Sequence, residues 1–408
     1  MEPNWKVQLN ILWTGQFILI AMMAMSLPFW PLYISELGSF TPQQIRFWSA
    51  AIYIAPFFAS IFSAPFWGKL GDSFGYKPMV IRACLGLFIT QTLILYFSDV
   101  VMIFIFKLLE GLLAGFIVAA QSWAIAIVPN TERSTTIGKL QSATAVGNLM
   151  GPLLGGLIAT YGGYHSIFMS SSIICAIITA MFLFLLESPK NSLANNISTE
   201  PIRTGKMFSY LQKQVLSILL VIILIQLARS MITPVFSLFV TEQLNGTDMT
   251  VGVLYAATGL MVFITAPLWG KLFDRFSQKP HYIYLIIISL LFACTIIQVL
   301  HAFFFTQTAI FILRLLWGVC LGALLPVLIR LLVDHAHERE SGFFLGLGNS
   351  AMKFGNLIGI ILGAFIEVNF GFTNSFLMTA LLYAFAGLVL LAINPLQNIR
   401  TNNYEYER

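Results

Sequence analysis

Five ionisable side chains lie inside long apolar stretches of this 408-residue chain. They are four cations and one carboxylate, namely Lys107, Glu110, Arg229, Arg314 and Lys353. An ionised group at the centre of a bilayer costs at least about 2.5–3.5 kcal/mol, so such groups need partners or water. Lys107 and Glu110 are three residues apart, a spacing that permits an ion pair on one helical face. We therefore expect these side chains to face a polar cavity.

Amide side chains continue these polar faces at helical spacing, and the candidates are Gln121, Gln226 and Asn349. If all five charged groups are ionised, the cavity carries about +3, which favours anionic ligands. The alternative is that desolvation leaves a lysine uncharged between turnovers, as a proton-coupled lysine would require. Glu110 is the one acidic side chain inside the expected spans, so it is the leading candidate for a protonation switch. The rival interpretation is a purely structural pair with Lys107.

Membrane-spanning helices must position these groups. The chain is 58% hydrophobic and 10% charged, which is too apolar for a soluble protein of this size. A helix needs about 20 apolar residues to cross a hydrocarbon core of roughly 30 Å. The sequence therefore predicts an all-α membrane protein with twelve transmembrane helices, whose approximate limits are 9–33, 45–67, 79–97, 100–128, 135–160, 164–186, 213–241, 249–270, 280–300, 303–332, 341–366 and 372–394.

Basic residues are distributed unevenly between the connecting loops. With the amino terminus in the cytoplasm, seventeen of the 22 lysines and arginines fall on the cytoplasmic side and Arg46 alone falls opposite. Cytoplasmic loops of membrane proteins carry this excess. We expect both termini in the cytoplasm, so the net charge of +5 reports topology and indicates no nucleic-acid partner.

The chain contains an internal duplication. The phrase APFWGKLGDSFGYKP at 64–78 returns 202 positions later as APLWGKLFDRFSQKP at 266–280, with ten of fifteen residues identical. The longest hydrophilic interval, 187–212, lies between the two copies. We therefore predict an amino-terminal six-helix bundle over 1–186, a cytoplasmic linker over 187–212 and a carboxy-terminal six-helix bundle over 213–408.

The repeated phrase resembles the loop signature that members of the major facilitator superfamily carry between their second and third helices. Its glycines permit a tight cytoplasmic turn, and Asp72 can accept hydrogen bonds at a helix amino terminus. The resemblance implies two pseudo-symmetric bundles (the MFS fold) and a gate in which Asp72 pairs with a basic residue that ends the fourth span, for which Arg133 is the candidate. The expected gate-loop residues are Gly68, Asp72, Gly75, Lys77, Arg133, Gly270, Asp274 and Arg275.

A second motif resembles the helix-five signature of the drug/proton antiporter branch of this superfamily. It reads GNLMGPLLGG at 147–156, and its residues are Gly147, Gly151, Pro152, Gly155 and Gly156. Glycines at every fourth position line one helical face and allow another backbone to approach closely, and the proline bends the helix. The alternative is ordinary small-residue packing. The branch typically carries an arginine and then a glutamine in its fourth helix, where this chain has Lys107 and Glu110.

The resemblance implies a proton-coupled antiporter that exports small amphipathic molecules, in the manner of multidrug efflux, by alternating access. The buried cations favour a second possibility, a dedicated exporter of an anionic metabolite or of a chelator such as a carboxylate siderophore. An organic-anion uptake carrier and a non-transporting membrane receptor are further alternatives. Aromatic and methionine side chains such as Met22, Trp30 and Tyr53 could line an apolar pocket.

Nothing in the sequence indicates an enzyme or a cofactor. His335 and His337 lack the spacing of a zinc-metalloprotease helix, so we expect no metal site. No phosphate-binding loop is present, so ATP would not drive transport through this chain. The expected partners are a small-molecule substrate, protons and the lipid bilayer. We expect a monomer in the cytoplasmic (inner) membrane.

Overall fold

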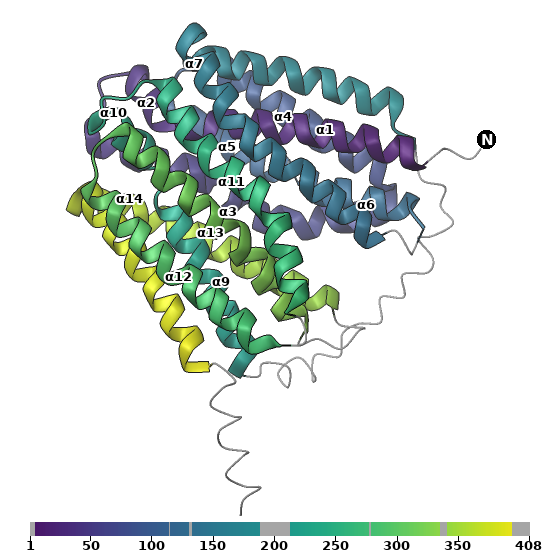
Figure 1. The fold of residues 1–408 in the computed structure, drawn as a ribbon. Helices are drawn as coiled ribbons and strands as arrows, with labels where there is room; N and C mark the ends of the chain where they lie inside the picture. Colours follow the sequence, from purple (N-terminus) through teal and green to yellow (C-terminus); the bar gives the residue numbers. More distant parts are fainter. Residues whose placement is uncertain are drawn as a thin grey trace, which may run out of the picture. The chain divides into compact units, whose positions relative to one another are not determined.

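The computed structural model describes residues 5–113, 115–129, 133–187, 213–276, 279–334 and 341–393. Within these ranges every regular element is a helix (Figure 1). The predicted linker 187–212 lies outside the described residues apart from Glu187. The first seven α-helices and one 3-10 turn are α1 (Trp5–Ser26), η1 (Leu27–Phe29), α2 (Trp30–Leu37), α3 (Pro42–Phe74), α4 (Tyr76–Tyr96), α5 (Val100–Leu113), α6 (Phe116–Ile127) and α7 (Arg133–Leu185).

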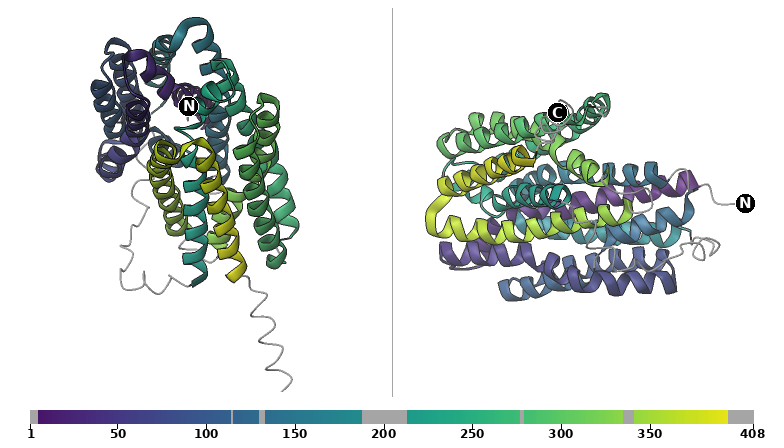
Figure 2. Two further views of the ribbon diagram at one scale, coloured as in Figure 1. Left: turned by 90° about the vertical axis from the view of Figure 1, so that its left-hand side faces the viewer. Right: turned by 90° about the horizontal axis from the view of Figure 1, so that it is seen from below.

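The second half begins with α9 (Lys213–Met231) and α10 (Phe236–Glu242). It continues with α11 (Asp248–Arg275), α12 (Pro280–Phe303), α13 (Gln307–Asp334) and α14 (Ser341–Ile393). Two further views show the same helices from other sides (Figure 2). The long elements α7 and α14 each contain one residue with non-helical backbone, Gly163 with φ 73° and Gly371 with φ 80°. Each is therefore two helices joined by a glycine, since positive φ is a conformation that favours glycine.

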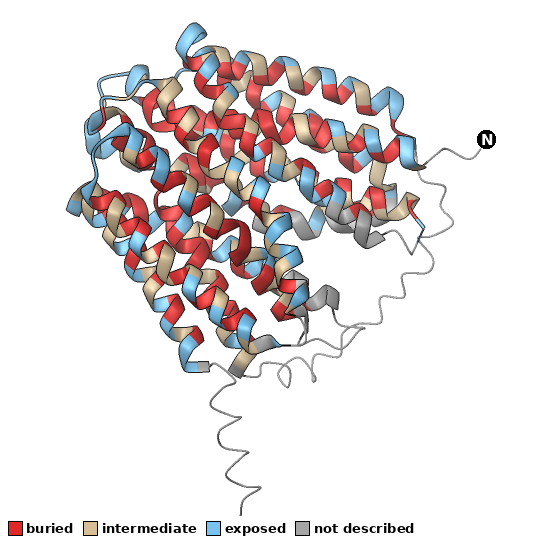
Figure 3. Cartoon of the chain, in the orientation of Figure 1, coloured by how far each residue is buried: buried red, intermediate tan, exposed pale blue. Residues whose placement is uncertain are grey.

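Nine helical stretches among the described residues are long and apolar enough to cross a membrane. Splitting α7 and α14 at their glycines and including the 33-residue α3 accommodates the twelve predicted spans. Large apolar side chains are widely exposed on these helices, for example Phe62 at 66%, Phe184 at 79% and Leu381 at 63%. Figure 3 shows that exposed positions recur along the helices. Such a surface is unfavourable in water and suits acyl chains. The predicted all-α membrane fold is confirmed.

The described residues divide into two compact units. The first contains α1 to α7 together with Phe236–Gly259, and the second contains the chain from α9 to Val235 and from Leu260 onward. The segment Phe236–Gly259 thus packs with the first unit although it comes from the second sequence copy. The predicted bundle limits 1–186 and 213–408 remain a prediction.

Prolines break the first predicted span into α1, η1 and α2. Pro31 has no N–H to donate to the carbonyl of Leu27, four residues earlier, and that carbonyl instead accepts a hydrogen bond from the Tyr53 hydroxyl on α3. The carbonyl that has no helical partner at this break is therefore hydrogen-bonded to a neighbouring helix. It places Trp30 at the start of α2.

Two helix limits differ from those expected. The predicted span 100–128 is present as the apolar stretch Val100–Ile127, but Gly115 adopts the left-handed conformation (φ 99°) and divides it into α5 and α6, whereas the corresponding α13 runs unbroken. The expected cytoplasmic turn at Gly68 is helical, since α3 extends to Phe74 and the chain turns only at Gly75 (φ 90°). The second copy behaves alike, because Gly270, Asp274 and Arg275 all lie within α11.

Candidate functional site

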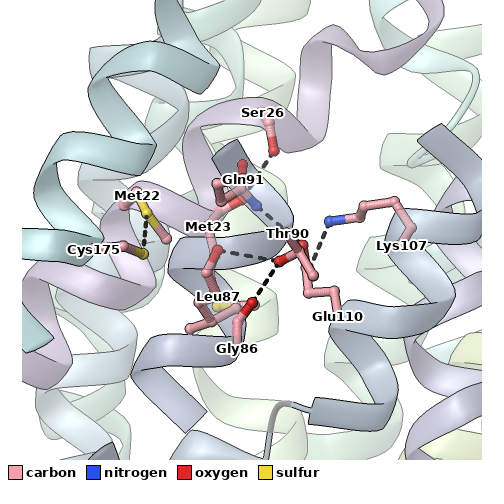
Figure 4. A network of polar contacts seen from close by, with 10 residues as sticks. All are labelled: Met22, Met23, Ser26, Gly86, Leu87, Thr90, Gln91, Lys107, Glu110 and Cys175. Carbon is pink, nitrogen blue, oxygen red and sulfur yellow. Dashed lines mark hydrogen bonds and ion pairs between the residues drawn. The ribbon is translucent and has the colours of Figure 1, made fainter. Parts of the chain in front are cut away.

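The predicted ion pair of the fourth span is present on α5. Lys107 Nζ lies 2.7 Å from Glu110 Oε1, and the two residues are 7% and 1% exposed. The other carboxylate oxygen accepts a hydrogen bond from Gln91 Nε2 of α4 at 3.0 Å (Figure 4). Both oxygens of Glu110 are thus occupied by side chains from two helices. Gln91 was not predicted from the sequence, because its partner lies nineteen residues away on another helix.

A close helix contact fixes the position of Glu110. The next residue, Gly111, meets α3 at Pro56, where a Cβ on the glycine would lie 2.3 Å from the Pro56 carbonyl oxygen. Ser63 of α3 donates a hydrogen bond of 3.1 Å to the Gly111 carbonyl. Since no side chain larger than hydrogen fits there, the glycine sets the distance between α3 and α5.

One aromatic ring contacts the Lys107 ammonium group, and further rings pack against that ring. Its Nζ lies 5.4 Å from the centroid of the Trp30 ring, within cation–π range. Trp30 is 1% exposed and packs against Phe168 at 5.1 Å and Tyr33 at 6.2 Å between ring centroids. Trp30, a candidate pocket residue, therefore belongs to a cluster of packed rings beside the ion pair.

The second unit carries a related but different arrangement. Arg314 of α13 is 4% exposed, and Trp317 holds the position that Glu110 has in the first copy. The Arg314 guanidinium carbon lies 5.2 Å from the Trp317 ring, whose Nε1 donates to the Tyr383 hydroxyl at 3.3 Å. Gln298 corresponds to Gln91 but has no hydrogen-bond partner for either amide atom among the described residues. The carboxylate is the component that this copy lacks at the equivalent position.

The other two intramembrane cations are exposed. Arg229 of α9 and Lys353 of α14 both have exposed side chains, whereas Gln226 is 5% exposed. Asn349, one turn before Lys353, is also exposed. Neither cation has an ion pair within the part of the chain that the structure describes. The four cations thus form two classes, the buried Lys107 and Arg314 and the exposed Arg229 and Lys353.

Gln121 does not continue the polar face of Lys107. It lies on α6 with intermediate exposure, beyond the break at Gly115. Because the break changes the helical phase, spacing counted along a single helix fails there. A place for Gln121 in the cavity lining therefore stays a prediction.

Two buried titratable residues lie where the sequence analysis placed none. Glu367 of α14 is 2% exposed and falls within the apolar stretch Leu347–Ala392, so Glu110 is not the one intramembrane carboxylate. The predicted span ended at 366, one residue too early. His301 of α12 is 1% exposed, has Nδ1 2.9 Å from the Ile297 carbonyl oxygen and stacks on Phe376.

Several gate-loop side chains lie outside the described part of the structure. Those of Asp72, Arg133 and Asp274 are among them, so their pairing stays a prediction. Lys77 is described and donates a hydrogen bond of 3.1 Å to the Leu183 carbonyl. Gly270 and Arg275 are exposed. His335 and His337 also lie outside the described residues, within which no group of three or more metal-ligating side chains occurs.

The glycines of the helix-five motif contact two different helices. Those at every fourth position pack on α1, where Cβ atoms at Gly147, Gly151 and Gly155 would lie 2.9, 2.5 and 2.3 Å from backbone oxygens. Gly156 instead meets Gly252 of α11, whose own Cβ would lie 2.7 Å from the Pro152 carbonyl oxygen. The regular glycines thus serve packing on α1, and the Pro152–Gly156 pair serves packing on α11.

The second copy repeats one of these two contacts. Gly355, Gly359 and Gly363 of α14 pack on α9, with Cβ atoms that would lie 2.6, 2.4 and 2.0 Å from its carbonyl oxygens. Near the α7–α11 contact, the Tyr164 hydroxyl donates to Asp248 Oδ1 at 2.7 Å. The duplicated motif is therefore a helix-packing device in both copies.

The whole chain was compared with known proteins. The sequence model of the Major Facilitator Superfamily matches residues 12–222 and 218–405. The chain belongs to the Major Facilitator Superfamily. It is accordingly an integral membrane transporter and not an enzyme.

Relatives of this superfamily align along nearly the full chain. A multidrug resistance protein MdtG of Klebsiella pneumoniae is 31% identical over 382 residues, covering 92% of this chain and 91% of the relative. The MdtG protein of Yersinia enterocolitica is 31% identical over 390 residues, covering 94% and 92%. A solved peptide transporter matches at a TM-score of 0.74 and 14% identity over 95% of this chain and 94% of its own, a likeness that shows the fold alone.

Proposed function

We propose that the protein is a proton-coupled antiporter that exports small amphipathic molecules from the cytoplasm across the inner membrane, with both termini in the cytoplasm. The relatives named for multidrug resistance support the efflux class. The observation that carries the coupling is the Glu110 carboxylate, which is 1% exposed inside a membrane helix and held by Lys107 and Gln91. In this proposal the protein acts as a monomer whose two bundles, 1–186 and 213–408, alternate in opening.

The proton enters the cycle at Glu110. A protonated Glu110 no longer pairs with the Lys107 ammonium, so proton binding changes the contact between the residue and its partners on α4 and α5. Alternating access needs two arrangements of nearly equal free energy. Gain or loss of one proton at the buried pair of Lys107 and Glu110 supplies the free-energy difference that favours one arrangement over the other.

The proposal is tested in inverted membrane vesicles with an imposed pH gradient. For an amphipathic drug without an ammonium group, Glu110→Gln should abolish the dependence of uptake on the gradient while binding of that drug persists. The matched control is Glu367→Gln, which alters another buried carboxylate and should keep the dependence. Gradient-dependent uptake that survives Glu110→Gln, or that is lost in Glu367→Gln alone, would contradict the assignment.

A second candidate function is export of an anionic metabolite or chelator. The observation that favours it is the exposure of Arg229 and Lys353, together with the neutralisation of Lys107 by Glu110. Accessible guanidinium and ammonium groups bind carboxylates by charge-assisted hydrogen bonds. Under this candidate, Arg229→Gln weakens the transport of anionic compounds more than that of cationic ones. Equal losses of transport for anionic and cationic compounds would exclude this candidate. Inward transport without export would instead favour an uptake carrier, and binding without any transport would favour a receptor.

A further inference from the structure

The Lys107 ammonium group lies between a carboxylate and an aromatic ring. Its Nζ is 2.7 Å from Glu110 Oε1 and 5.4 Å from the centroid of the Trp30 ring. The carboxylate supplies an opposite charge and the indole supplies the negative face of its π system. The Glu110 carboxylate and the Trp30 ring are thus the components of a binding site for an organic ammonium ion.

The Trp30 ring and the Glu110 carboxylate each have further contacts that do not involve the lysine. The ring of Trp30 is held by Phe168 at 5.1 Å and by Tyr33 at 6.2 Å between centroids. The carboxylate of Glu110 is held through its second oxygen by Gln91 at 3.0 Å. Because these contacts come from α2, α4 and α7, they persist when the lysine head group leaves.

The site is shielded from water, which strengthens its preference for a cation. Trp30 and Glu110 are each 1% exposed and Gln91 is 2% exposed. A buried carboxylate without a cation or a proton is strongly destabilised, and a cation–π contact is stronger when it is desolvated. When Lys107 withdraws, the site therefore attracts another positively charged group.

We propose that Trp30, Glu110 and Gln91 form a subsite for the ammonium group of an amphipathic amine, and that Lys107 fills it as a tethered ligand when no amine is bound. The inference rests on the proposed function in that it names a chemical group of the exported substrates. Trp30 is then a specificity-determining residue. The lysine head group competes with the substrate, so binding requires the side chain to move aside.

The second unit provides an internal contrast. Arg314 lies 5.2 Å from the ring of Trp317, and Trp317 occupies the sequence position on α13 that corresponds to Glu110 on α5. Lys353 is exposed and likewise has no carboxylate one turn away on its own helix. A carboxylate one turn away on the same helix, together with a ring, is thus found at Lys107 and not at Arg314 or Lys353.

The test is chemical rescue of purified full-length protein in lipid nanodiscs. Lys107→Ala removes three carbons and the ammonium group, which n-propylammonium replaces. We expect a lower melting temperature for the variant and a dose-dependent recovery with n-propylammonium, but none with n-propanol, which lacks the charge. The wild type and the control variant Lys353→Ala should show no such recovery.

A second variant covers the case in which Lys107→Ala fails to fold. Lys107→Met keeps an apolar side chain as far as the Cε position and removes the ammonium nitrogen, and the small methylammonium ion supplies the missing charge. Addition of Trp30→Leu to either variant should reduce the affinity for the ammonium probe at least tenfold. Recovery that is equal with the uncharged alcohol, equal in Lys353→Ala, or unaffected by Trp30→Leu would overturn the proposal.

The readout is ligand binding and does not need transport. Absence of rescue with intact gradient-driven export would refute the subsite and leave the proposed function standing. Rescue without any export would refute the function and leave the subsite. The two failures are therefore distinguishable.

Discussion

Glu110 shares its two oxygens between side chains from different helices, and this sharing defines the chemistry of the site. Lys107 neutralises the carboxylate at 2.7 Å, and Gln91 satisfies the remaining oxygen at 3.0 Å. A buried ion pair stabilises a fold only when its remaining hydrogen-bonding capacity is satisfied. Gln91 therefore matters to the pair as much as the lysine does. The charges left accessible are those of Arg229 and Lys353.

The two copies of this glutamine differ in their hydrogen bonding, which gives the first prediction. Gln91→Leu removes the donor to Glu110 and should destabilise the protein by about 1–3 kcal/mol, because a buried charged oxygen loses its partner. Gln298→Leu should be neutral or stabilising, since neither atom of that amide has a hydrogen-bond partner among the described residues. Thermal unfolding of the two variants measures the difference. Equal losses of melting temperature would show that the contact to Glu110 contributes nothing specific.

Some of these residues could be found from the sequence and others could not. The pairing of Lys107 with Glu110 follows from a spacing of three on one helix. Gln91 and Trp30 contact the pair from other helices, and a single sequence contains no signal for such contacts. Glu367 was missed because the apolar run was ended just before it, whereas the helix continues to Gly371.

At the scale of elements, glycine spacing determines which helices touch. Gly151 of α7 and Gly359 of α14 hold equivalent places against α1 and α9. The repeat of four residues predicts a close helix contact, but not the identity of the partner. The structure assigns α1 and α9 to the regular glycines, and α11 to Pro152 and Gly156. The motif thus combines an internal packing surface with a second contact that only one copy has.

Glycine-to-alanine changes provide the second prediction. Gly151→Ala should destabilise by about 1–3 kcal/mol through overpacking, since its Cβ would lie 2.5 Å from the Ala21 carbonyl oxygen. The control Gly270→Ala lies in a helix with nothing within 4 Å and should stabilise by up to about 1 kcal/mol. Melting temperatures of the purified variants check both signs. A stabilising Gly151→Ala would contradict the close contact.

Helix limits were predictable where apolar runs end at polar or proline residues. The spans 79–97 and 280–300 correspond to α4 (Tyr76–Tyr96) and α12 (Pro280–Phe303). The breaks inside membrane helices were not predicted, because Gly115 is not distinguishable in sequence from a helical packing glycine. Its positive φ depends on the surrounding helices, and the equivalent α13 stays continuous.

At the scale of the whole molecule, duplication of the sequence does not translate into equal chemistry in the two halves. Both copies keep the glycine contacts and a buried cation in the corresponding helix, but only the first pairs that cation with a carboxylate on the same helix. The fold and the family followed from hydropathy and two motifs, and the described helices are consistent with twelve spans. The asymmetry of the site required coordinates, because it depends on contacts between helices.

The predicted orientation gives a third prediction. All four native cysteines, at 84, 175, 294 and 320, are buried, so an introduced exposed cysteine can be labelled selectively. With cytoplasmic termini, Ser39→Cys should react with an impermeant maleimide in intact spheroplasts, and Lys271→Cys should react only after permeabilisation. The reverse labelling pattern would invert the topology.

Release of protons on substrate binding tests the central claim most directly. An amphipathic amine is added to purified wild-type protein in weakly buffered solution, and the change of pH is recorded. At a pH at which Glu110 is protonated before the amine binds, the account predicts release of protons by the wild type, none by Glu110→Gln, and weaker amine binding by the variant. Saturable binding by the wild type with no proton released at any pH would contradict proton-coupled antiport through Glu110.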